Sequence, residues 1–205
     1  MAKRSKTSPS GEREQVATAL ERLIKESKYK DALDFLNTLA APLRNEIRIR
    51  QLEGLALARF GHLEEAQDVL GRLHGEGHLD AETLGIYART WMDRYDKTGS
   101  KDHLRRSRDL YAEAFQRSPK DYYTGINAAA KSVFLGEETV AGGFAGQVEK
   151  LVGTRPKRGD YWITATAAEA QLLRRHYDRA ARLYRAAVVD TPNERGSHDS
   201  TRLQA

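Results

Sequence analysis

Three polar side chains recur at four-residue spacing in the segment that follows Asp121. Tyr123, Asn127 and Lys131 stand at i, i+4 and i+8, so on a helix they share one face. An aromatic ring can stack on a planar ligand, an amide both donates and accepts hydrogen bonds, and an ammonium group attracts negative charge. This set predicts a site for a polar, planar ligand such as a nucleotide or a peptide terminus.

Two further segments supply side chains of the same kinds, one before and one after the first. If the three helices that carry these side chains lie side by side, the three sets of side chains line a single groove. The candidate ligand-binding residues are Glu82, Arg89, Tyr123, Asn127, Lys131, Trp162, Thr166 and Glu169.

The same residue types also have a structural interpretation, which stays open at this point. Tyr and Trp at helical spacing commonly pack between helices, and core packing is the favoured role for Trp162. Arg89 and Asn127 fit structural hydrogen bonding as well as they fit ligand binding. Lys131 and Glu169 are expected on a solvated surface, because Lys and Glu are rarely buried.

Residues for catalysis or metal binding do not come together in the sequence. It contains no phosphate loop with its lysine, no Gly-x-Ser-x-Gly elbow, no His-Glu-x-x-His motif and no calcium loop. His62, His74 and His78 have no acidic partner at ligand spacing, and the absence of cysteine excludes thiolate zinc sites. We expect no catalytic residues, no bound metal and no cofactor, and therefore a protein that is not an enzyme.

The elements that must position these side chains repeat with a period of about 34 residues. Four sets of residues share the spacing of one helix face, each with a small residue in second place. In chain order they are Tyr29, Ala32, Leu36 and Leu39, then Leu63, Ala66, Leu70 and Leu73, then Leu104, Ser107, Tyr111 and Ala114, then Tyr177, Ala180, Tyr184 and Ala187. A small residue at the second position lets two antiparallel helices approach closely.

Each of these helices follows another amphipathic segment across a short polar turn, so the predicted unit is helix, turn, helix. First helices are expected near 13–26, 45–59, 80–95, 121–135 and 160–174, and second helices near 29–40, 63–74, 102–117, 138–152 and 177–190. The helix near 138–152 contains Gly142, Gly143 and Gly146, each weakening it by about 1 kcal/mol relative to Ala. We expect that helix to be bent, short or locally mobile.

The period, the small residues at the helix crossings and the closing prolines Pro119 and Pro192 resemble tetratricopeptide repeats. Segments 82–89, 121–129 and 160–170 are similar to the sensor-type tetratricopeptide domain, also called the TRAFs-binding domain, of apoptosis-signal-regulating kinases and many bacterial proteins. The chain departs from that family at Ala88, where a second glycine is common. The resemblance implies an all-α fold, a right-handed α-solenoid of about five helical hairpins.

In that family such domains sit beside signalling or effector modules and have been proposed to sense nucleotide-derived molecules in stress or immune systems. The resemblance therefore implies a ligand-sensing module that binds a nucleotide-like molecule in its concave groove and signals to a partner effector. The alternative is a protein-interaction scaffold that clamps a peptide or helix of a partner. A third possibility is one half of a two-protein assembly, since no polar capping helix is expected after Pro192.

The charge distribution and the composition of the chain limit which partners and which cellular compartment are expected. Residues 1–30 hold eight Lys or Arg against four Glu, which accounts for most of the net charge of +5. The rest of the chain is nearly neutral and lacks the broad positive field of nucleic-acid-binding proteins. No segment approaches the roughly 18 apolar residues of a membrane helix, and residues 1–10 lack a signal-peptide core, so a cytoplasmic protein is expected.

The two ends of the chain are polar and have no apolar period. Residues 1–12 are expected to form a disordered basic tail and residues 191–205 a second disordered tail. The repeat domain is then expected to span residues 13–190.

Overall fold

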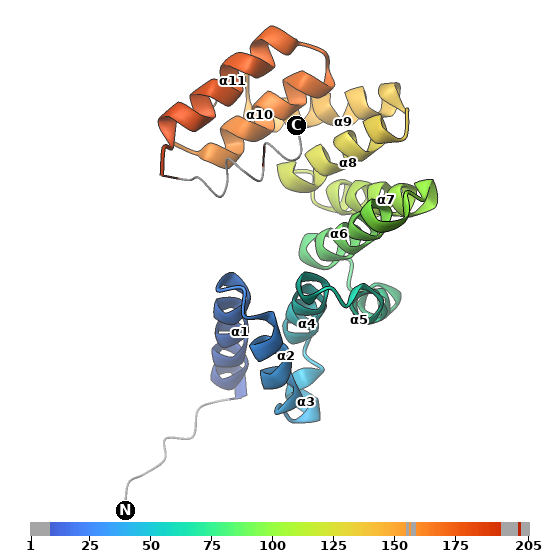
Figure 1. The fold of residues 1–205 in the computed structure, drawn as a ribbon, viewed down its shortest axis with the longest axis vertical. Helices are drawn as coiled ribbons and strands as arrows, with labels where there is room; N and C mark the ends of the chain where they lie inside the picture. Colours follow the sequence, from blue (N-terminus) through green and yellow to red (C-terminus); the bar gives the residue numbers. More distant parts are fainter. Residues whose placement is uncertain (1–8, 155, 157–158, 194–200, 202–205) are drawn as a thin grey trace, which may run out of the picture. The chain divides into compact units, whose positions relative to one another are not determined.

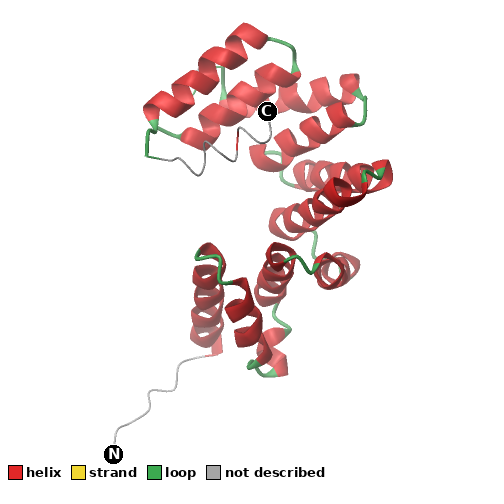
Figure 2. Cartoon of the chain, viewed as in Figure 1, coloured by secondary structure: helices red, strands yellow, loops and turns green. Residues whose placement is uncertain are grey.

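The computed structural model describes residues 9–154, 156, 159–193 and 201, and within these residues there are eleven α-helices and no strand (Figure 1). Figure 2 shows short loops joining the helices throughout this part of the chain. The chain divides into two compact units, Met1–Arg94 and Tyr95–Ala205.

The first unit holds two helical hairpins, a short helix and most of a further long helix. Its helices are α1 (Pro9–Lys25), α2 (Tyr29–Asn37), α3 (Ala41–Arg44), α4 (Ile47–Phe60), α5 (Leu63–Gly75) and α6 (Ala81–Thr98), which contains the boundary between the units. Helix α4 packs against α1, α2 and α5. The apolar core between α1, α2 and α4 consists of Val16, Leu20, Ala32, Leu36, Ile49, Leu52 and Ala56.

The second unit continues with five helices that stack in chain order. They are α7 (Lys101–Arg117), α8 (Tyr122–Phe134), α9 (Glu138–Val152), α10 (Tyr161–Leu173) and α11 (Tyr177–Asp190). Each helix packs on the next, and α8 also packs on α10 (Figure 1). Contacts limited to neighbouring repeats are typical of an α-solenoid. Its main core cluster is Phe115, Ile126, Val148, Val152, Ala167 and Ala170.

Small residues stand where helices cross most closely. Ala66 and Ala180 are buried, as their place in the repeated pattern predicts. A Cβ atom on Gly54 would lie 2.7 Å from the Cγ of Leu70, and one on Gly125 would lie 2.7 Å from the Cγ2 of Val148. These distances are shorter than van der Waals contact, so α4 and α8 approach the next helix closely only because these positions lack a side chain.

The turns inside the hairpins use one residue in the left-handed backbone region. Gly61 (φ 98°) fills this position between α4 and α5, and Gly136 (φ 81°) fills it between α8 and α9. Between α10 and α11 the position belongs to Arg175, with φ 64°. A residue with a Cβ pays roughly 1–2 kcal/mol for this conformation, so Arg175 occupies a strained position that glycine would fill more easily.

Every helix expected from the sequence is present, and the all-α fold of helical hairpins is confirmed. Helix α1 begins at Pro9, inside the segment expected to be a tail, because Pro and an acidic residue such as Glu12 favour a first helical turn. Helix α9 runs unbroken for 15 residues despite its glycines, because packing of its buried face outweighs their low helix propensity.

Parts of the expected tails lie outside the described residues, namely 1–8, 194–200 and 202–205.

In the part of the chain that the structure describes, no helix is both long and apolar enough to cross a membrane.

Candidate functional site

Helices α8 and α10 begin in the same way and lie side by side. The carboxylate of Asp121 accepts a hydrogen bond from the backbone N–H of Tyr123 (3.1 Å), and that of Asp160 accepts one from Ile163 (3.0 Å). Each aspartate satisfies an N–H group that the first helical turn leaves without a partner. Both helices therefore start at an aspartate cap, and they pack together.

Lys131 is the charged residue in the last turn of α8, and it is only 6% exposed. Its Nζ donates a hydrogen bond to Asn127 Oδ1 (2.9 Å) and lies 5.7 Å from the centre of the Tyr111 ring on α7. Asn127 in turn donates from Nδ2 to the carbonyl of Tyr123 (2.9 Å). The prediction of a solvated Lys131 is therefore wrong, because the amide and the ring replace water around the ammonium group.

Two aromatic rings stand half-exposed in the first turns of these helices. Tyr123 is 51% exposed, and its ring is nearly perpendicular to that of Tyr111, with 6.2 Å between the ring centres. Trp162 is 47% exposed, and its ring is nearly perpendicular to that of Tyr161, with 5.3 Å between the ring centres. Core packing of Trp162 is thus wrong, since the neighbouring Tyr161, only 3% exposed, takes the buried position.

Glu169 lies on α10, three residues after the buried Thr166, and is itself partly buried. Burial raises the pKa of Glu169 to about 7, although the nearby positive charge of Lys131 lowers it in part. Burial, with the charge of Glu169 added, also raises the pKa of Tyr184 on α11 far above its usual range. The structure therefore brings together Lys131, Glu169 and Tyr184, of which the repeat pattern identified Tyr184 only as a packing residue.

The expected solvated surface for Glu169 is also wrong. Its side chain is partly buried, and the rise in its pKa has burial as its main cause. The pattern of one helix places Glu169 on a face but contains no information about what covers that face.

Glu82 and Arg89, the other two predicted site residues, belong to α6 in the first unit. Glu82 accepts a hydrogen bond from Arg48 (3.0 Å), which also donates to Glu21 (2.7 Å). Arg89 pairs with Asp93 one turn further along α6 (2.8 Å). The structure thus gathers six of the eight predicted residues in the second unit, and a binding role for Glu82 and Arg89 stays a prediction.

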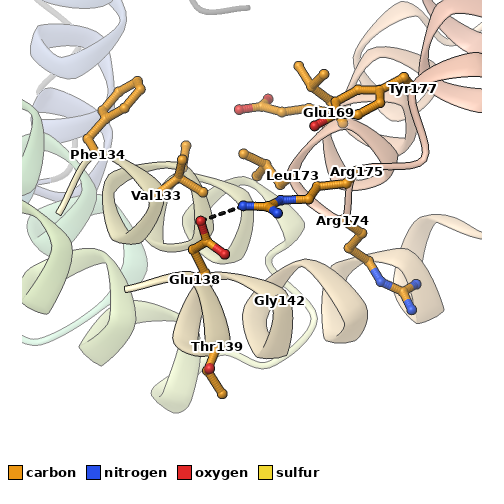
Figure 3. A pocket seen from close by; sticks show the side chains of 12 residues that line it. Val133, Phe134, Glu138, Thr139, Gly142, Glu169, Leu173, Arg174, Arg175 and Tyr177 are labelled. Atoms are coloured by element: carbon orange, nitrogen blue, oxygen red, sulfur yellow. Dashed lines mark hydrogen bonds and ion pairs between the residues drawn. The ribbon is translucent and has the colours of Figure 1, made fainter. Parts of the chain in front are cut away.

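A pocket of about 830 Å³ opens in the second unit between the α8–α9 hairpin and the α10–α11 hairpin (Figure 3). The residues that line it are Ala130, Val133, Phe134, Glu138, Thr139, Gly142, Glu169, Leu172, Leu173, Arg174, Arg175 and Tyr177. The pocket therefore has an apolar lining with charged groups among it. Across it Glu138 forms an ion pair with Arg175, drawn as a dashed line in Figure 3.

Among the lining residues the sequence had singled out only Glu169 for binding. Tyr177 heads the repeated pattern of α11, which predicts packing, yet it is 62% exposed. Phe134 is 51% exposed at the end of α8. A large aromatic residue next to a hairpin turn is only a weak signal for ligand binding, because such residues more often cover the edge of an apolar core.

No group of three or more His, Cys, Asp or Glu side chains that could hold a metal ion occurs within the described residues. His62 and His74 instead pack near the rings of Phe60 (4.9 Å) and Tyr87 (6.1 Å).

Comparison with known proteins relates this geometry to one family. The family model described as Tetratricopeptide Repeats-Sensor matches residues 28–133. A thermophilic tetratricopeptide protein of Thermus thermophilus is 14% identical and superimposes with a TM-score of 0.72, covering 94% of this chain and 98% of that chain. No curated protein matches the sequence.

Two further solved structures are similar. A tetratricopeptide repeat protein from Parabacteroides merdae is 12% identical with a TM-score of 0.58, covering 94% of this chain and 73% of that chain. The MamA protein is 11% identical with a TM-score of 0.57, over 89% and 95% of the two chains. At these identities the likeness concerns the fold alone.

Proposed function

The chain belongs to the Tetratricopeptide Repeats-Sensor family, and on this basis we propose that it is a non-enzymatic sensing module. It binds a small nucleotide-like molecule along α8 and α10 of the second unit and passes the signal to a partner effector protein. The contacts come from Tyr123, Asn127 and Lys131 on α8 and from Trp162 and Thr166 on α10.

The observation that carries this proposal is a desolvated cation on the same helix face as an exposed aromatic ring. Lys131 is buried, and a positive charge in surroundings of low dielectric constant attracts an anionic group more strongly than one in water. Tyr123 and Trp162 leave about half of their surface to solvent. Stacking a base on such a ring contributes about 1–3 kcal/mol.

The test is calorimetry against a panel of mononucleotides and dinucleotides, including NAD-derived ones. Tyr123→Ala and Trp162→Ala should each weaken binding about tenfold or more, because each removes one stacking surface. Both rings are half-exposed, so thermal unfolding should move by only a few degrees. Phe60→Ala, which removes a similarly exposed ring in the first unit, is the matched control and should bind as wild type.

A second candidate, the protein-interaction scaffold, has one observation in its favour. Glu21, Arg48 and Glu82 form a line of ion pairs across α1, α4 and α6, and polar groups repeated on successive first helices are what a peptide clamp requires. If no nucleotide binds, and a captured partner peptide is lost with Arg48→Ala but kept with Tyr123→Ala, the sensing proposal fails and the scaffold takes its place.

A further inference from the structure

The pocket between the two C-terminal hairpins is lined by one carboxylate, that of Glu169, with no hydrogen-bond donor among the described residues. Among the described residues none donates a hydrogen bond to Glu169 or pairs with it in direct contact. In the view of Figure 3 its carboxylate lies between Phe134 and Tyr177, which line the same pocket. A partly buried carboxylate that has no hydrogen-bond donor is stabilised by any ligand that brings a positive charge or an N–H group.

The walls around this carboxylate suit the apolar part of such a ligand. Val133, Leu172 and Leu173 form apolar surface, and Phe134 and Tyr177 present aromatic rings. Aromatic faces attract cations through the negative charge of their π-systems. The volume of about 830 Å³ lies within the range of small-molecule sites.

The other charged groups of the pocket are already paired. Arg175 pairs with Glu138, and Arg174 pairs with Glu149 on α9. In each pair the two opposite charges neutralise each other. Among the residues that line the pocket, Glu169 is therefore the carboxylate that remains available to a ligand.

We propose that this pocket is a second binding site, and that it takes an organic cation: an ammonium or guanidinium group on an apolar stem. The cation meets Glu169 between the two rings, and the stem lies on Val133, Leu172 and Leu173. The same chemistry is offered by a free amine and by a Lys or Arg side chain of a partner protein. This site goes beyond the sensing function proposed above and does not depend on it.

The positive charge of Lys131 repels a cationic ligand at this site. Its ammonium lies close enough to lower the pKa of Glu169, but it donates its hydrogen bond to Asn127 and faces the Tyr111 ring. From α11, Tyr184 faces Glu169 as a neutral phenol, because burial raises its pKa. Lys131 therefore reduces the negative potential at Glu169 without occupying the position of the ligand.

Arg175 lines the same pocket. It holds the left-handed backbone conformation that Gly61 and Gly136 adopt in other hairpins and that Ser27 adopts between α1 and α2. Its side chain reaches across the pocket to Glu138 (Figure 3).

The experiment is an NMR titration of the full chain with labelled Val and Leu methyl groups. The probe is 2-phenylethylamine, and 2-phenylethanol is its uncharged counterpart of the same shape. We expect the amine to shift the methyl signals of Val133 and Leu173 and to bind about tenfold tighter than the alcohol at pH 8, because a charged hydrogen bond replaces a neutral one. Between pH 8 and pH 6 the amine affinity should fall about fivefold to tenfold as Glu169 takes up a proton.

Three variants make the test specific. Glu169→Gln should remove the difference between the amine and the alcohol. Gly142→Leu should block both probes, since Gly142 lines the pocket, whereas Gly143→Leu on the next residue should not. Both glycines lie in α9 with no atom within 4 Å of an added Cβ, so the two substitutions affect the helix alike.

Three results would overturn the proposal: equal binding of amine and alcohol to wild type, an amine affinity that Glu169→Gln leaves unchanged, or equal effects of the two leucine substitutions. The source of the cation is decided by a blocked peptide with Arg between two Leu residues. Tighter binding of the peptide than of the amine assigns the site to a partner's side chain, and binding of the amine alone assigns it to a free amine.

Discussion

Glu169 is held in its state of charge by two opposing influences. Burial disfavours the ionised carboxylate, and the positive charge of Lys131 favours it. The balance leaves the pKa at about 7, above the ordinary value of 4.5. An acid whose pKa is raised on folding stabilises the folded state most below its unfolded pKa, and this contribution is lost as the pH rises through the folded pKa.

Glu169→Gln should therefore stabilise the protein at high pH and leave it nearly unchanged at low pH. The shift from 4.5 to about 7 corresponds to at most about 3 kcal/mol, and partial exposure of the side chain reduces the expected gain to about 1–2 kcal/mol at pH 8. Urea unfolding at pH 4 and pH 8 measures the difference. The same gain at both pH values would contradict the assignment.

Lys131→Met tests the other half of the balance. The methionine side chain keeps much of the apolar stem but has no charge, so the attraction of Lys131 that lowers the pKa of Glu169 disappears. The pKa should rise above 7, and a carboxyl ¹³C titration of Glu169 measures it directly. An unchanged or lower pKa would show that the two groups do not interact.

At the scale of helices, glycines divide into those that permit packing and those that face open space. A Cβ on Gly125 would lie 2.7 Å from Val148 and 2.8 Å from Phe115, which are both buried. Around Gly143 and Gly146 there is no atom within 4 Å of an added Cβ. The first kind holds the α8 crossing together, whereas the second only lowers the helix propensity of α9.

Alanine substitution should separate the two kinds by the sign of its effect. Gly125→Ala should destabilise the protein by about 1–3 kcal/mol through overpacking. Gly143→Ala should stabilise it by about 0.5–1 kcal/mol, because Ala is the better helix former. Urea midpoints report both, and a stable Gly125→Ala variant would mean that α8 can move away from α9 without cost.

At the scale of the whole molecule, the two units predict two regions of local stability. Chains built from stacked repeats are stabilised by contacts between neighbours, so damage in one repeat spreads over a limited distance. Gly54→Ala overpacks α4 against Leu70 in the first unit, and Gly125→Ala overpacks α8 in the second.

Native-state hydrogen exchange should therefore respond locally to each substitution. Gly54→Ala is expected to lower amide protection in α4 and α5 and to leave α8, α9 and α10 as in wild type. Gly125→Ala is expected to do the reverse. Equal loss of protection in both units after either substitution would mean that the chain unfolds as one cooperative body.

The sequence alone determined the helices and the hairpin unit, which the structure confirms, and the resemblance to sensor-type tetratricopeptide repeats, which the family match confirms. It could do so because helix periodicity, small residues at crossings such as Ala66 and Ala180, and turn glycines are local signals. Four of the five second helices share this pattern, and the glycine-rich α9, which does not, is also found at the residues expected for it.

The tertiary structure alone decided which side chains are covered. Periodicity puts Lys131 and Tyr123 on one face of α8, but the approach of α7 and Tyr111 determines that the lysine is buried while the tyrosine stays half-exposed. Glu169 meets Phe134 and Tyr177 in one pocket because two hairpins pack together. Such contacts join residues far apart in the chain, and their geometry depends on the packing of whole helices, which no local pattern contains.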